Sequence, residues 1–155
     1  MIRRLVPDEW EDFRKVRLAA LRDAPYAFGS TSERERTADE KSWRTRLGNR
    51  AQLVAEIDGE IVGTAAGIAS DEERAALISM WVAPQVRGQG VGARLVNAVL
   101  DWAKDERFSS VSLWVTDGNA VAERLYERCG FMRTGAVQPV HPGEPRVEFE
   151  MWLRI

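Results

Sequence analysis

The clearest chemical signature lies in the segment Val82-Ala83-Pro84-Gln85-Val86-Arg87-Gly88-Gln89-Gly90-Val91-Gly92. Pro84 should end the apolar strand that precedes it, because proline cannot donate to a strand ladder. A helical pattern opens at Gly90, and the unpaired amides of a first helical turn, backed by the helix dipole, bind anions such as phosphate. Gly88 lacks the Cβ atom that would keep a phosphate away from the backbone, and Arg87 can add a charged contact. We therefore expect an anion-binding turn here.

The residue sequence of the turn and its place along the chain distinguish it from two other phosphate-binding loops. A P-loop ends in Gly-Lys-Ser or Gly-Lys-Thr, whereas Gly92 is followed by Ala93-Arg94. A dinucleotide-binding turn tolerates Ala93 at its third glycine position, but it follows the first strand of its unit, and this turn follows several antiparallel-looking strands. A glycine turn with a purely structural role stays an alternative, since glycine often marks turns for backbone reasons.

A second block, Asn119-Ala120-Val121-Ala122-Glu123-Arg124-Leu125-Tyr126-Glu127-Arg128-Cys129-Gly130-Phe131, follows the turn along the chain. The turn resembles the signature Gln/Arg-x-x-Gly-x-Gly/Ala of the GCN5-related N-acetyltransferases. The second block is similar to the Asn…Ala…Leu-Tyr-Glu…Gly-Phe block of that family. The resemblance is clear over residues 52–131 and weakest over residues 26–47.

The resemblance implies an α/β fold, with a mixed, mostly antiparallel sheet that helices flank on both faces. It implies acetyl-CoA as the co-substrate and an amine, either a small molecule or a protein amine, as the acceptor. The main chain of Trp81 and Val82 should bind the acetyl carbonyl and the pantetheine arm, and Asn119 should contact the pantetheine. The pyrophosphate should be wrapped by Arg87, Gly88, Gln89, Gly90, Val91 and Gly92.

The resemblance also implies that Tyr126 lies beside the thioester sulfur, and simple chemistry agrees with such a role. When an amine attacks a thioester the sulfur leaves as a thiolate, and a phenol with a pKa of about 10 is protonated and can donate to it. We therefore expect Tyr126 to be the general acid. The alternative is a packing tyrosine at helical spacing from Leu125 and Cys129.

The general base has no obvious candidate in the sequence. Some family members carry a glutamate five positions before the asparagine of the second block, where this chain has Trp114. Glu33 and Glu35 are candidates, as is a water chain to backbone carbonyls. His141, in the loop between the last two expected strands, would have a suitable pKa, but an isolated loop histidine is usually only solvated. No second histidine accompanies it, so no metal ligand set is expected.

Trp81 and Trp114 are the aromatic residues that we expect to line the acceptor pocket, which would favour an apolar amine or a flat ring. Cys129 follows the packing pattern of its helix, so we expect direct transfer without an acyl-enzyme. A protein of another class is the alternative: an acyl-CoA-binding sensor or interaction domain that keeps the fold without turnover.

The elements that must position these residues can be predicted from periodicity and turn residues. Strands are expected at residues 2–6, 52–57, 60–69, 75–82, 110–115, 132–137 and 146–153. Helices are expected from Pro7 to about Leu21, then at 32–47, 90–104 and 119–129. The dipeptide Asp58-Gly59 favours a two-residue hairpin turn. No pattern could be assigned from Tyr26 to Thr31.

Composition bounds the function further. The 155 residues fit one domain, residues 1–155, with 45% hydrophobic and 30% charged residues. A formal charge of −2 provides no broad positive field for nucleic acid. No apolar run approaches the ~20 residues of a membrane span, and a single cysteine suits a reducing compartment, so we expect a cytoplasmic protein. A homodimer through the last strands is also an expectation.

Overall fold

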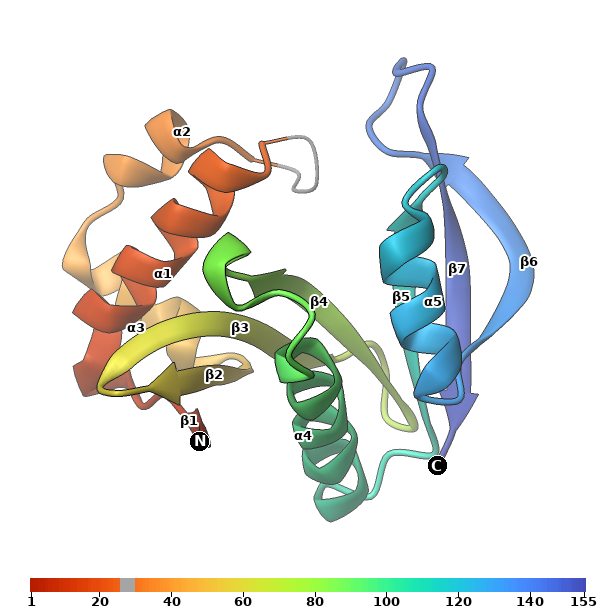
Figure 1. Ribbon diagram of the computed structural model, residues 1–155, viewed down its shortest axis with the longest axis horizontal. Helices are drawn as coiled ribbons and strands as arrows, with labels where there is room; N and C mark the ends of the chain where they lie inside the picture. The colour runs from red at the N-terminus through yellow and green to blue at the C-terminus, as the bar shows by residue number, and fades with distance from the viewer. Residues whose placement is uncertain (26–29) are drawn as a thin grey trace.

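The computed structural model describes residues 1–25 and 30–155, and these form one seven-stranded sheet (Figure 1). The strand order is β1-β2-β3-β4-β5-β7-β6. The strands are β1 (Ile2–Arg4), β2 (Ala51–Ile57), β3 (Glu60–Ala69), β4 (Arg74–Val82), β5 (Ser110–Thr116), β6 (Met132–Pro139) and β7 (Val147–Arg154). Every pairing is antiparallel except that of β4 with β5. The expected mixed, mostly antiparallel sheet is confirmed.

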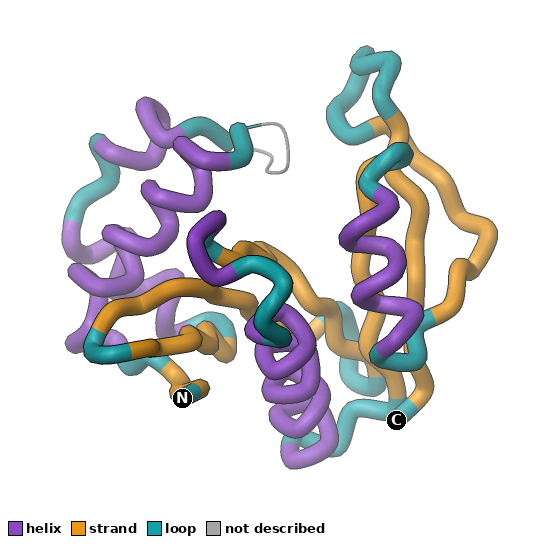
Figure 2. The backbone as a smooth tube through the Cα atoms, in the orientation of Figure 1, coloured by secondary structure: helices purple, strands orange, loops and turns teal. Residues whose placement is uncertain are grey.

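Helices cover both faces of this sheet (Figure 2). They are α1 (Trp10–Asp23), α2 (Ser32–Arg36), α3 (Glu40–Gly48), α4 (Val91–Asp105) and α5 (Ala120–Arg128). On one face Phe13 of α1 packs edge-on against Trp43 of α3, with ring centroids 5.3 Å apart. On the other face α4 approaches β3 so closely that a Cβ atom at Gly67 would lie 2.4 Å from the Trp102 ring.

The hairpin between β2 and β3 has the expected turn. Asp58 and Gly59 have φ angles of 51° and 81°, and two successive positive φ values match the right-handed twist of the flanking strands. This turn fixes the pairing Ile57↔Glu60 and with it the start of the β2–β3 register.

Two helical predictions were wrong in detail. The single charged helix expected at 32–47 is two helices, because Asp39 caps a new one: its side chain accepts a hydrogen bond from the Ser42 amide at 2.9 Å. The helix expected from Pro7 opens with a 3-10 turn, Pro7–Glu9, and the α-helix begins at Trp10. Of the unassigned stretch from Tyr26 to Thr31, residues 26–29 lie outside the described part of the chain.

The sheet divides between β4 and β5. These two strands pair only from Arg74↔Ser110 to Ala76↔Ser112. A β-bulge then redirects β4, because Ala66 pairs with Ile78 while Thr64 pairs with Trp81, which leaves one extra residue on β4. Ser79 lies in this bulge with a φ of 57°. We call the diverging ends of the two strands, residues 77–82 and 113–116, the β4–β5 wedge.

Candidate functional site

The glycine turn joins the end of β4 to α4, as its sequence predicts. Ala83 leads into a short 3-10 turn, Pro84–Val86, and α4 begins at Val91. Gly88 and Gly90 have φ angles of 79° and 82°, values that glycine adopts without strain. In the described chain the amides of residues 88–90 donate no hydrogen bond, and α4 adds the unpaired amides of its first turn. The turn therefore presents a row of free donors at the positive end of a helix.

The Arg87 side chain is directed away from this row of amides. Its Nε donates to the Val82 carbonyl at 3.0 Å, and its Nη2 donates to Asp23 Oδ2 at 2.5 Å. The guanidinium thus ties the end of β4 to the end of α1. The charged contact to an anion that we expected from Arg87 would require it to leave these partners.

Asp23 also fixes Trp81, since its Oδ2 accepts a hydrogen bond from the Trp81 indole N–H at 2.9 Å. The hydrogen bonds from Trp81 and Arg87 lower the pKa of Asp23 against the opposing effect of burial. Trp81 consequently points towards α1, where it lines a cavity of about 340 Å³ together with residues of α1 and of the β2–β3 hairpin. Asp23 was not among the predicted site residues, because nothing in the adjacent Ala24-Pro25 sequence indicates its partners.

The second sequence block lies beside the first in space. A Cβ atom at Gly92 would lie 3.0 Å from Leu125 Cδ2 and 3.8 Å from Val82 Cγ2. The first turn of α4, the helix α5 and the end of β4 therefore meet at one place, next to the wedge. Val91 is buried in the core below this point, while Gln89 is exposed.

Asn119 and Tyr126 are placed by α5. The Asn119 side chain caps this helix by accepting a hydrogen bond from the Ala122 amide at 3.2 Å. The Tyr126 ring is buried and packs against Phe131, with centroids 5.9 Å apart. Burial raises the pKa of the Tyr126 phenol above its ordinary value, so that the hydroxyl stays protonated. Burial also raises the pKa of Cys129, which makes its thiol a poor nucleophile.

The candidate bases differ sharply in their surroundings. Burial opposes ionisation of Glu35, but hydrogen bonds from Arg17 and Arg46 outweigh it and lower its pKa to about 2. A carboxylate held in this way is a very weak base. Glu33 is exposed on α2, and His141 lies half-buried in the β6–β7 loop.

Trp114 lies on the face of the sheet opposite α5. It pairs with Glu150 of β7, and 38% of its surface is exposed. The Glu150 carboxylate accepts a hydrogen bond from the Thr134 hydroxyl at 2.9 Å. Trp114 is two residues beyond Ser112, the last residue of β5 to pair with β4, so its backbone lies in the wedge.

None of the helices within residues 1–25 and 30–155 combines the length and the hydrophobicity that a membrane-spanning helix needs.

Known proteins resemble this chain in sequence and in fold. The model of the acetyltransferase (GNAT) family matches residues 5–131. An uncharacterized N-acetyltransferase of Archaeoglobus fulgidus is 31% identical over 132 residues, which cover 81% of this chain and 88% of that protein. The chain spans 38% or less of the length of several mammalian relatives that it also matches.

Solved structures share the whole fold. A GNAT-family acetyltransferase from Streptococcus pneumoniae has a TM-score of 0.84 at 18% identity, covering 100% of this chain and 99% of that one. An acetyltransferase from Salmonella typhimurium, solved with its cofactor acetyl-CoA, has a TM-score of 0.78 at 22% identity and covers 99% and 92%. The family match over most of the sequence and the archaeal relative show that this chain belongs to the GNAT family of N-acetyltransferases, and the common fold agrees with them.

Proposed function

We propose that this chain transfers an acetyl group from acetyl-CoA directly to an amine, with no acyl-enzyme. One observation carries the proposal: the free amides of the glycine turn follow the end of β4 that has separated from β5, next to the wedge. An elongated substrate with a diphosphate at one end and a thioester at the other can therefore occupy the turn and the wedge together. The raised pKa of Cys129 supports transfer in a single step.

The diphosphate would be bound mainly by main-chain groups. The amides of residues 88–92 and the positive end of α4 provide donors and a favourable field for an anion. Arg87 would contribute through its backbone, because its guanidinium already binds Asp23 and Val82.

The thioester end would lie along β4 and beside α5. The main chain of Trp81 and Val82 would bind the acetyl carbonyl and the pantetheine arm. Arg87 already occupies the Val82 carbonyl, so the arm must share or displace that contact. Asn119, fixed as the cap of α5, would contact the arm near the amide that it accepts from.

Tyr126 would act as the general acid. As the amine nitrogen bonds to the thioester carbonyl carbon, the carbon–sulfur bond breaks and the sulfur takes up a proton. The Tyr126 hydroxyl, kept protonated by burial, would donate that proton, and the proton that the nitrogen loses as it becomes an amide would restore the phenol. The attacking amine must first lose a proton of its own, and the low pKa of Glu35 leaves that step to water or to another carboxylate.

The acceptor would be a small molecule or a protein amine that approaches the face where Trp114 is exposed. Trp114 and Glu150 are a cross-strand pair there, so an apolar or flat group could lie on the indole while an ammonium lies near the carboxylate. The composition and the single cysteine suit a cytoplasmic enzyme.

The test is thiol release from acetyl-CoA in the presence of a panel of amines. We expect release to require both substrates and to saturate with each of them. Acetyl-CoA binding without release for any amine would favour the sensor alternative. Failure to bind acetyl-CoA or coenzyme A at all would contradict both functions.

A further inference from the structure

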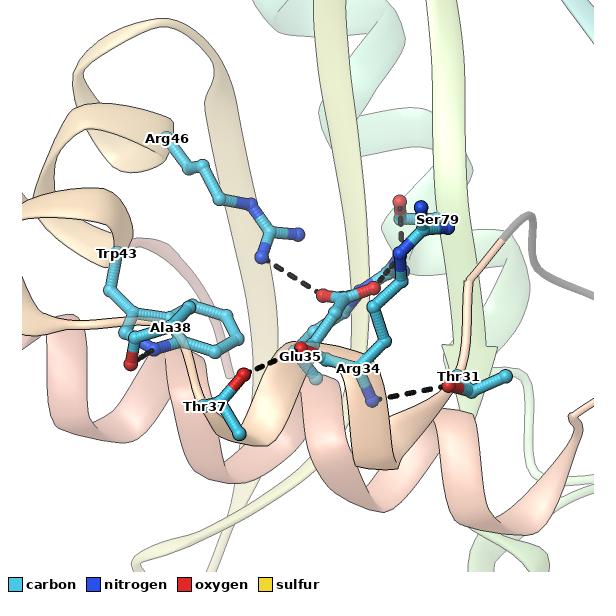
Figure 3. Close-up of polar contacts among 9 residues, drawn as sticks. Thr31, Arg34, Glu35, Thr37, Ala38, Trp43, Arg46 and Ser79 are labelled. Atoms are coloured by element: carbon cyan, nitrogen blue, oxygen red, sulfur yellow. Dashed lines mark hydrogen bonds and ion pairs between the residues drawn. The ribbon is translucent and has the colours of Figure 1, made fainter.

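A cluster of charged side chains links the helices on one face of the sheet to the bulged strand (Figure 3). Glu35 of α2 lies at its centre. Its two carboxylate oxygens accept hydrogen bonds from Arg17 Nε and Nη2, both at 3.1 Å, and Oε1 also accepts from Arg46 Nη1 at 2.9 Å. The Arg17 and Glu35 side chains are only 11% and 12% exposed. Their bidentate pairing therefore fixes the orientation of the Arg17 guanidinium.

The third nitrogen of Arg17 reaches the sheet. Its Nη1 donates to the Ser79 hydroxyl at 3.3 Å, across 62 residues of sequence. Ser79 is the bulge residue with a φ of 57°, a left-handed conformation that is strained for any residue other than glycine. Such a conformation persists only where neighbouring groups hold it, and Arg17 is one of them.

The bulge determines where the end of β4 runs. Pairing with β5 stops at Ala76, and the register with β3 shifts between Ile78 and Trp81. The residues that follow Ser79 include Trp81 and Val82, whose main chain is proposed to bind the thioester. A small change in the φ of Ser79 would therefore move the groups that align the reacting carbonyl.

We propose that Arg17 and Glu35 are positioning residues for the acetyl transfer: Glu35 orients Arg17, and Arg17 holds the Ser79 bulge that sets the course of residues 80–82. The proposal rests on the proposed function of the wedge. It assigns a role to α1 and α2 that neither sequence block suggests.

Glu35 also provides a negative charge among three guanidinium groups, those of Arg17, Arg46 and Arg50. Burial, together with the charges of Arg46 and Arg17, lowers the pKa of Arg50 to about 10. Replacing Glu35 would leave all three cations without this carboxylate, so a Glu35 variant mixes stability with positioning. Arg17 and Arg46 offer a cleaner comparison, because both bind Glu35 and only Arg17 contacts Ser79.

The experiment compares Arg17→Gln and Ser79→Ala with the matched control Arg46→Gln. In folded protein, well below each melting temperature, Arg17→Gln and Ser79→Ala should each lower kcat about ten- to a hundredfold, because misplacement of the reacting groups is costly. The double variant should be no slower than the slower single variant, since both act through one contact. Affinity for coenzyme A should fall less than kcat, because its diphosphate still binds the glycine turn while only its pantetheine arm lies along residues 81 and 82. Arg46→Gln should keep its kcat.

A second measurement does not depend on turnover. Amide hydrogen exchange over residues 79–82 should quicken in Arg17→Gln and in Ser79→Ala, and should match the parent protein in Arg46→Gln. If Arg17→Gln does not fold, Ser79→Ala decides the matter by itself. Unchanged exchange and unchanged kcat in Ser79→Ala would overturn the proposal, as would an equal loss of kcat in Arg46→Gln. A parent protein that releases no thiol with any amine would instead contradict the proposed function and leave the exchange test standing.

Discussion

At the scale of single residues, Tyr126 is the proposed proton donor. Its ring is held between α5 and Phe131, and burial keeps its hydroxyl in the neutral form. Three residues further on, at the end of the same helix, burial also raises the pKa of the Cys129 thiol. If the acetyl group passes directly to the amine, the reaction needs the Tyr126 hydroxyl and not the Cys129 thiol.

Tyr126→Phe should lower kcat by about 10²-fold or more, the usual contribution of a general acid. Acetyl-CoA affinity should hardly change, because the ring and its packing remain. Steady-state kinetics with the best amine of the panel, together with calorimetric titration of acetyl-CoA, would measure the two effects separately.

Cys129→Ser is the control on the same helix and should retain most of the turnover. A Phe variant as fast as the parent would make Tyr126 a packing residue. Loss of activity in Cys129→Ser with normal stability would instead indicate an acyl-enzyme.

The glycines, Asn119 and Tyr126 could be named as candidates from sequence because each belongs to a local pattern, and their roles stay predictions. Asp23 could not, since its partners Trp81 and Arg87 are 58 and 64 residues away. The same is true of Arg17 and Ser79. Side chains that act through distant partners leave no local signal, and here they fix the end of β4 and redirect Arg87.

At the scale of elements, the strand–turn–helix junction owes its shape to two glycines in left-handed conformations. The structure also contains a matched turn elsewhere. Gly59 in the β2–β3 hairpin has a φ of 81°, against 82° at Gly90, and a Cβ atom would meet no atom within 4 Å at either position. Alanine would therefore cause similar backbone strain at the two sites.

Gly90→Ala should weaken the binding of coenzyme A, because the strained residue would turn the free amides away from the diphosphate. Gly59→Ala should leave binding unchanged, while both variants lose a similar stability of about 1 kcal/mol. Calorimetric titration and thermal unfolding of the two variants would show this difference. If Gly90→Ala and Gly59→Ala bound coenzyme A with equal affinity, the glycine turn would not be part of the binding site.

Element boundaries followed from sequence where turn chemistry is explicit and failed where it is not. Asp58-Gly59 predicted its hairpin, and Pro84 marked the end of β4. The division of one expected helix into α2 and α3 depends on Asp39, which reads as an ordinary charged residue until its capping bond is seen. The bulge at Ser79 was invisible as well, since the segment 75–82 reads as a regular apolar strand.

At the scale of the whole molecule, the Glu35 cluster links stability to pH. The carboxylate has a pKa of about 2 in the folded chain, below the ordinary value of 4.5. A depressed carboxyl pKa stabilises the folded state fully above the unfolded value, and the stabilisation is lost as the pH falls from about 4.5 towards 2.

Glu35→Gln should therefore be less stable than the parent protein at neutral pH, and the difference should shrink steadily below pH 4.5. Denaturant unfolding at several pH values would measure it. Glu33→Gln, a change at an exposed position on the same helix, should be about as stable as the parent protein at neutral pH. A difference for Glu35→Gln that is independent of pH would mean that the side chain acts through its shape and not its charge.

The strands β4 and β5 pair over only part of their length. Beyond Ala76 and Ser112 the facing edges of the two strands do not bond to each other. A pantetheine arm lying there would supply the hydrogen bonds that the two strand edges do not make to each other. The bound co-substrate would thus act as part of the sheet. Binding would then raise the free energy of unfolding by about 2.7 kcal/mol when the ligand is present at a hundred times its Kd. After each turnover the wedge would be empty again, and the free enzyme would be less stable than the bound form.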